Sequence, residues 1–120
     1  MIHPKRLVLS FQYAFEGIAH AFTNDQNIRI HALSAFVVIL AGIFFQLSSL
    51  EMAILVMMTG VVFVAELANT AIEEMVDFIV NEHHRQAKII KDVSAAMVLA
   101  AAVAAVIVGL LIFIPHVVAF

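Results

Sequence analysis

The fold is decided by the stretch Glu66-Leu-Ala-Asn-Thr-Ala-Ile-Glu-Glu-Met-Val-Asp77, which follows a run, residues 52–65, without a single charge. At a helical advance of about 100° per residue, one narrow wedge contains Glu66, Asn69, Glu73 and Asp77. The spacing predicts a polar stripe about 16 Å long on an otherwise apolar helix. A carboxylate in or beside a bilayer is costly unless it meets a cation, a proton or water, so the stripe indicates a functional site.

Composition describes what surrounds this stripe. Hydrophobic residues make up 64% of the chain, and only six Lys and Arg and nine Asp and Glu occur among 120 residues. The mean hydropathy of +1.08 excludes an ordinary soluble domain and predicts an integral membrane protein. There is no cysteine, which excludes a disulfide framework and a thiol nucleophile. Residues 1–6 lead into a mixed segment without a small-residue cleavage site, so we expect no removable signal peptide.

The N-terminal part, residues 5–23, reads as an amphipathic helix that follows Pro4. Its apolar residues share one side and its polar residues the other, with Leu9 as the exception. Such a helix can lie in the headgroup layer with its apolar face sunk by roughly 5–10 Å. It can equally pack against transmembrane helices, and the sequence leaves both interpretations open.

Three later segments are apolar and long enough to cross about 30 Å of hydrocarbon. We expect the first span at 30–50, the second at 52–80 with a polar extension, and the third at 93–114, closed by Pro115. Residues 81–92 form the most polar connection. The predicted architecture is an all-α membrane protein with one domain over residues 1–120. Alanines in the third span allow close packing in lipid, and three spans enclose little alone, so we expect an oligomer.

Orientation follows from the basic residues. All six lie before the first span or between the second and third: Lys5, Arg6, Arg29, Arg85, Lys88 and Lys91. The positive-inside rule therefore predicts that these segments, the N-terminus and the polar layer face the cytoplasm.

Two acids in that layer, Asp25 and Glu73, are hard oxygen ligands of the kind Mg²⁺ uses when it also holds substrate phosphates. A deeper carboxylate could accept a proton from an alcohol, so the set predicts phosphoryl transfer onto a lipid. Other interpretations stay open. Glu74 and Glu82 suit interfacial ion pairs, and Glu66 alone would also suit a proton-coupled transporter, while a non-enzymatic scaffold needs none of these roles.

Nucleotide-binding motifs are absent, because the four glycines build neither a P-loop nor a dinucleotide fingerprint. A nucleotide would have to be held by helical side chains and metal. The adjacent His83 and His84 would point about 100° apart on a helix, which favours a solvated loop over a metal site. We expect no nucleic-acid partner.

Three segments of the sequence together resemble a known protein family. The run Glu66-Leu-Ala-Asn-Thr-Ala-Ile-Glu73, the later Ala87-Lys-Ile-Ile-Lys-Asp-Val93 and the segment Asn24-Asp-Gln-Asn-Ile-Arg-Ile-His31 resemble the small bacterial membrane kinases that phosphorylate diacylglycerol or undecaprenol. The likeness extends over nearly the whole chain, including the amphipathic start and three spans. The pattern of Glu66 to Glu73 is specific to that family.

The resemblance implies a homotrimer in the bacterial cell membrane that uses ATP and Mg²⁺, with active sites between subunits. It implies Glu66 as the general base, with Asn69, Arg6 and His31 beside the lipid substrate. Asp25 and Glu73 would hold the metal. The nucleotide would be contacted by these two acids and by Arg6, Tyr13, Glu82, His84, Lys91 and Asp92. Asp25 departs from the family pattern, where glutamate is expected, and its side chain is one methylene shorter.

The segments at 28–31 and 88–93 resemble the Gram-positive branch, whose members phosphorylate undecaprenol. We therefore expect an undecaprenol kinase, with a diacylglycerol kinase as the alternative. Both acceptors are primary alcohols on long apolar tails, so chemistry alone does not separate them.

Overall fold

The computed structural model describes all residues, 1–120, as four helices. They are α1 (Pro4–Asn24), α2 (Gln26–Phe44), α3 (Ser49–Ile79) and α4 (Arg85–Ala119). Helices α2, α3 and α4 are each long and apolar enough to cross a membrane. The prediction of an all-α membrane protein with a further N-terminal helix is confirmed.

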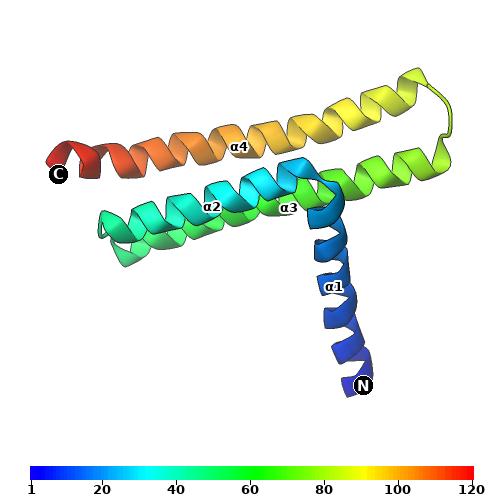
Figure 1. The fold of residues 1–120 in the computed structure, drawn as a ribbon, viewed down its shortest axis with the longest axis horizontal. Coiled ribbons are helices and arrows are strands. Elements are labelled where there is room, and N and C mark those ends of the chain that lie inside the picture. Colours follow the sequence, from blue (N-terminus) through cyan, green and yellow to red (C-terminus); the bar gives the residue numbers. More distant parts are fainter.

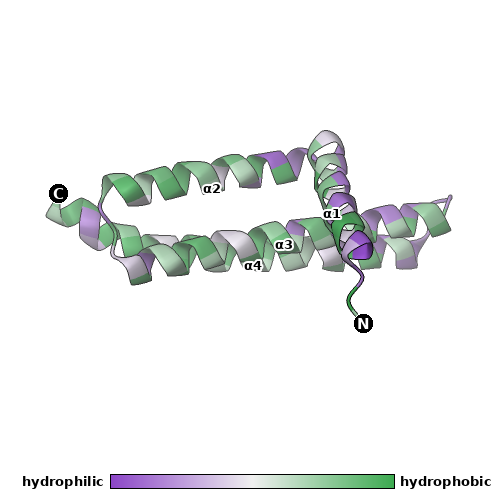
Figure 2. Ribbon diagram, turned by 90° about the horizontal axis from the view of Figure 1, so that it is seen from below, coloured by the Kyte–Doolittle hydropathy of each residue, from purple (hydrophilic) through white to green (hydrophobic).

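Helix α3 lies at the centre of the arrangement, because α1, α2 and α4 all contact it. Helices α2 and α4 run antiparallel to α3, and α1 leaves the bundle almost at a right angle (Figure 1). Figure 2 shows hydrophobic residues along the bundle and hydrophilic residues gathered where α1 meets it and near the α3–α4 connection. Only 12 of 120 residues are buried, so most apolar side chains face outward, as suits a chain surrounded by lipid or neighbouring subunits.

The turn between α2 and α3 corrects the expected end of the first span at residue 50. Helix α2 ends at Phe44 because Gln46 adopts a left-handed backbone conformation with φ of 54°. The amides of Gln46 and Leu47 then bond back to the carbonyls of Ile43 and Gly42, which is a Schellman motif. The expected start of the second span at 52 is also late, because Ser48 and Glu51 form a capping box that begins α3 at Ser49.

Helix α4 differs from the expected third span at both ends. It begins at Arg85, where the His84 side chain accepts a hydrogen bond from the Gln86 amide, so much of the predicted connector is helical. It also continues through Pro115 to Ala119 instead of ending there. A proline this close to a helix end removes one intrahelical donor, and the turn that follows is held by His116, whose imidazole contacts the Glu51 carboxylate at 3.0 Å.

A single residue, Asp25, separates α1 from α2, whereas the expected helix at 5–23 and span at 30–50 left residues 24–29 between them. The angle between the helices is held by Arg29, which donates to the carbonyls of Phe22 and Thr23, and by a contact between His20 and Glu74 on α3. Helix α1 makes few contacts with the bundle, and apolar side chains such as Phe11 and Phe15 are exposed. Within one chain, α1 therefore does not pack along the transmembrane helices.

Candidate active site

Glu66 is the most buried ionisable group of the chain, with 1% of its surface exposed. Its Oε1 is enclosed and has no hydrogen-bond partner. Its Oε2 lies 3.6 Å from Nε2 of His31, which α2 brings to α3 from the side. The sequence offered no basic group for Glu66 on its own helix, and the structure supplies an imidazole from the next one. A buried carboxylate with an unsatisfied oxygen is an available proton acceptor.

Asn69 lies one turn beyond Glu66 on the same face and is 6% exposed. Its Oδ1 accepts a hydrogen bond of 2.7 Å from the Ser94 hydroxyl on α4. This bond joins α3 to α4 beside the carboxylate. The predicted proximity of Glu66 and Asn69 is thus part of a buried polar cluster that also includes a serine from another helix.

Asp25 enters the same cluster from the α1–α2 junction. Its Oδ2 accepts a hydrogen bond of 2.7 Å from Thr70, its Oδ1 accepts one of 2.9 Å from the Asn27 amide, and its carboxyl lies close to that of Glu66. Burial by itself raises the pKa of Asp25, but the Thr70 and Asn27 donors stabilise its charged form and lower the pKa below the ordinary value. Asp25 is therefore an anion at neutral pH.

The bond to Asn27 also makes Asp25 the N-cap of α2. Aspartate is among the preferred residues at that position, and glutamate is not. The aspartate, at a position where the resemblance leads us to expect glutamate, thus has a structural role as a helix cap.

Glu73, on the exposed side of the stripe, lies close enough to Glu66 for their charges to interact. No group of three or more His, Asp or Glu side chains gathers into a complete metal site. Two carboxylates that leave the other positions to water and phosphate are nevertheless the donor set that Mg²⁺ uses in phosphate-handling sites. Asp25 and Glu73 are residues that fit such an ion.

At the outer end of the stripe, Asp77 contacts Lys91 of α4. Within α4, Lys88 contacts Asp92 at 2.6 Å, so two of the expected nucleotide residues, Lys91 and Asp92, lie in ion pairs at one end of the bundle. Asp77 is about 16 Å from Glu66 by helix rise. The pair of Lys91 with Asp77 marks the outer end of the polar stripe.

The remaining expected residues lie apart from this cluster within one chain. Arg6 and Tyr13 are exposed on α1, which leads away from the bundle, and no hydrogen bond joins either side chain to the stripe. Glu82 and His84 are exposed in the α3–α4 connection, where His84 serves as the N-cap of α4. Glu82 forms no ion pair, whereas Glu74 pairs with His20 and not with a lysine.

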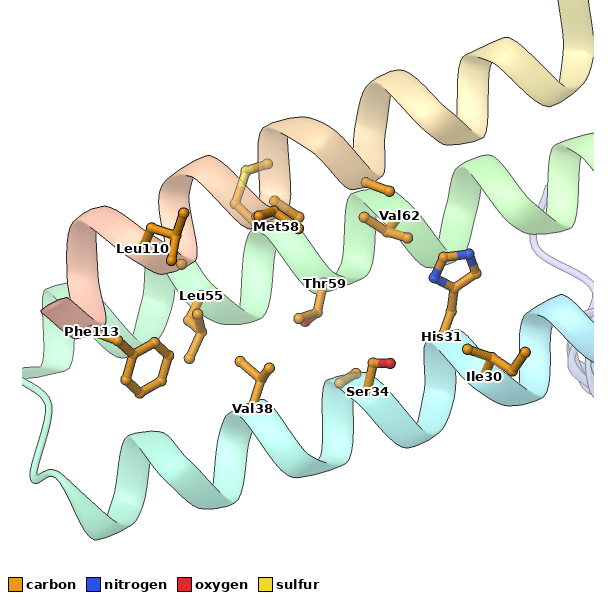
Figure 3. A pocket seen from close by; sticks show the side chains of 15 residues that line it. Ile30, His31, Ser34, Val38, Leu55, Met58, Thr59, Val62, Leu110 and Phe113 are labelled. Atoms are coloured by element: carbon orange, nitrogen blue, oxygen red, sulfur yellow. The ribbon is translucent and has the colours of Figure 1, made fainter. Parts of the chain in front are cut away.

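A cavity of about 460 Å³ opens between α2, α3 and α4 on the membrane side of Glu66. Most of its lining is apolar, with Val38, Leu55 and Phe113 along its length (Figure 3). His31 and Ser34 bring polar atoms to one end, and Figure 3 shows the His31 ring at the wall formed with Val62, four residues before Glu66. The cavity therefore has an apolar body and a polar end next to the buried carboxylate.

Several contacts between separate parts of the chain were not predicted from the sequence. They are the contacts of Ser94 with Asn69, Thr70 with Asp25, Asp77 with Lys91 and His20 with Glu74. Ser94 had one available signal, since it is the sole polar residue of the predicted third span. The others depend on the rotation of neighbouring helices, which periodicity within one helix does not define.

The chain is similar to known bacterial lipid kinases over most of its length. Residues 12–113 match the family described as prokaryotic diacylglycerol kinase. The chain is 42% identical over 110 residues to a diacylglycerol kinase of Synechocystis, which covers 91% of this chain and 63% of that protein. It is 41% identical to the undecaprenol kinase of Bacillus subtilis, over 92% of this chain and 89% of the relative. It is 26% identical to the Escherichia coli diacylglycerol kinase, over 85% of this chain and 84% of that protein.

Proposed function

This chain belongs to the prokaryotic diacylglycerol kinase family, and from that premise we propose that it transfers a phosphoryl group from ATP to the hydroxyl of a membrane lipid alcohol. The acceptor that we propose is undecaprenol, with undecaprenyl phosphate as product. Diacylglycerol is the alternative, since relatives of both names match.

One observation carries this proposal: a buried carboxylate with an unpartnered oxygen lies beside the polar end of an apolar cavity. An alcohol on an apolar tail has the same division into one polar head and a hydrocarbon body. With the tail in the cavity, the hydroxyl would lie near His31 and Glu66. A scaffold has no need for an unsatisfied buried acid, because such a group destabilises the fold.

Glu66 acts as the general base in this reaction. The lipid oxygen forms a bond to the γ-phosphorus of ATP, the bond from that phosphorus to the ADP oxygen breaks, and the hydroxyl proton passes to the Glu66 carboxylate. Asn69 and His31 orient the hydroxyl and the carboxylate. Burial excludes water, which would otherwise compete as acceptor.

Asp25 and Glu73 are the residues that would hold Mg²⁺. Held there, Mg²⁺ would supply positive charge that offsets the negative charge of the nucleotide phosphates. Lys91 and Asp92 contact the nucleotide toward the outer end of the stripe, and Arg6, Tyr13, Glu82 and His84 complete its site. Because Arg6 and Tyr13 lie away from the stripe in one chain, we propose a homotrimer in which neighbouring subunits share each site.

The protein is a multi-pass membrane protein, and we propose the bacterial cytoplasmic membrane as its location. The six basic residues support an orientation with the N-terminus and the polar stripe in the cytoplasm, where ATP is available.

The test is a parallel assay of the purified protein with Mg²⁺, radiolabelled ATP and either undecaprenol or diacylglycerol in mixed micelles. We expect phosphorylation of both classes to be measurable and undecaprenol to give the higher kcat/KM. Equal or faster turnover of diacylglycerol would overturn the choice of lipid. Absence of a phosphorylated lipid in both assays would overturn the kinase activity itself.

A further inference from the structure

The Ser94 hydroxyl donates a hydrogen bond to another helix, whereas the hydroxyls of Ser10 and Thr23 bond only within their own helix. Ser10 donates to the carbonyl of Arg6 and Thr23 to that of Ala19, each four residues back in the same helix. This is the ordinary bond of a helical hydroxyl. Ser94 instead donates to Oδ1 of Asn69 at 2.7 Å, and both side chains are buried, at 4% and 6% exposed.

An asparagine amide presents an acceptor on one side and two donors on the other. If the oxygen faced the Glu66 carboxylate, two negative atoms would lie together in a buried place, which is costly. The Ser94 hydroxyl occupies that oxygen from the side of α4, so the NH₂ group is left to face away from α4. The buried Oε1 of Glu66, one helical turn away, is an acceptor without a partner.

We propose that Ser94 is a positioning residue that fixes the Asn69 amide with its NH₂ group directed at the Glu66 carboxylate. This proposal rests on the kinase reaction described above, and it adds a residue that does not touch substrate. Through Asn69, Ser94 holds the Glu66 carboxylate in one rotamer, with an oxygen presented to the lipid hydroxyl. An unfixed carboxylate would share its time among several rotamers and accept the proton less often in the reactive geometry.

The kinetic test compares Ser94→Ala with Val98→Ala, a matched control one turn along the same buried face of α4. We expect Ser94→Ala to lower kcat roughly three- to tenfold, the kinetic equivalent of one oriented hydrogen bond, with the KM for ATP unchanged. Ser94→Thr retains the hydroxyl and should recover most of the rate. Val98→Ala should retain the wild-type kcat. Equal losses of kcat in Ser94→Ala and Val98→Ala would overturn the proposal, because packing alone would then explain them.

A double-mutant cycle tests the route through Asn69. In an Asn69→Ala background, Ser94→Ala should cause no further loss of kcat, because the amide that it orients is gone. The same fold loss in both backgrounds would show that Ser94 acts independently of Asn69 and would overturn the proposal.

A direct readout does not need turnover. With ¹⁵N-asparagine labelling, the Asn69 side-chain amide signal is identified by its disappearance in Asn69→Ala. We expect its protons to exchange slowly in the wild type and at least several-fold faster in Ser94→Ala. An amide signal unaffected by Ser94→Ala would overturn the proposal. Absence of lipid phosphorylation by the wild-type protein would instead overturn the kinase function, and the amide exchange would then decide the role of Ser94 alone.

Discussion

Helix α3 carries two glutamates in opposite surroundings, and their difference separates structure from chemistry. Near its start, Glu51 accepts a hydrogen bond from the Ser48 amide and contacts His116, and its side chain is 30% exposed. Glu66 is enclosed, and its Oε1 has no partner. Glu51 has hydrogen-bond partners, and its contact with His116 joins the start of α3 to the end of α4. Glu66 has capacity left for a substrate, which is what a proton acceptor requires.

The largest expected effect on kcat comes from removing the charge of Glu66, and the matched control removes the charge of Glu51. Glu66→Gln should lower kcat by about 10²- to 10⁴-fold, the usual contribution of a general base, while the protein remains folded and inserted. Glu51→Gln should leave kcat near the wild-type value and lower the thermal midpoint, because it loses the charge that faces His116. Lipid-kinase rates and melting curves of both variants are the measurements. Full activity in Glu66→Gln would refute its role as base.

A smaller effect is expected along the exposed edge of the same stripe. Glu73→Gln should raise the Mg²⁺ concentration for half-maximal rate by roughly 10- to 100-fold, since even outer-shell partners of a metal contribute that much. Its neighbour Glu74 pairs with His20, so Glu74→Gln should leave the Mg²⁺ titration unchanged. Superimposable titrations for Glu73→Gln and the wild type would remove Glu73 from the metal site.

The smallest effect concerns Asp25, where the structural and the chemical role meet in one side chain. Asp25→Glu keeps the charge but loses the preferred N-cap of α2, so it should lower the free energy of unfolding by about 1 kcal/mol. Asp25→Asn keeps a good cap and loses the charge, so its defect should appear as a higher Mg²⁺ requirement with little loss of stability. Denaturation and Mg²⁺ titrations of both variants check this contrast. A stability loss in Asp25→Asn as large as in Asp25→Glu would contradict it.

Within each helix, the sequence predicted much of this molecule. Hydropathy defined three spans, and the spacing of Glu66, Asn69 and Glu73 placed them on one face. The helix ends were less predictable. Gln46 ends α2 through a left-handed conformation that glycine usually adopts, and Pro115 lies inside α4 because the turn after it is held by a contact with α3. Ser48 and Glu51 have the Ser-x-x-Glu spacing of a capping box, a sequence signal for the start of α3 that the expected start at residue 52 left out.

The contacts between helices could not be predicted from the sequence, and the reason is physical. The bond of Ser94 with Asn69 and that of Thr70 with Asp25 depend on how each helix is rotated against its neighbour. A single sequence shows which side chains share a face of each helix. It does not show how one helix is rotated against the next, because that rotation results from packing. The family resemblance predicts the site residues, and the structure shows which neighbouring side chains contact Asp25, Glu66 and Asn69.

The unbroken course of α3 couples the depth of Glu66 to the thickness of the surrounding bilayer. Glu51 and Glu66 are separated by about 22 Å of helix rise, less than the roughly 30 Å of a typical hydrocarbon core. If Glu51 stays at the far boundary, a thicker membrane draws Glu66 farther below the headgroups, and a thinner one brings it toward ATP. In the kinase reaction proposed above, lipid chain length would then change the distance between acceptor and donor through the rigid helix.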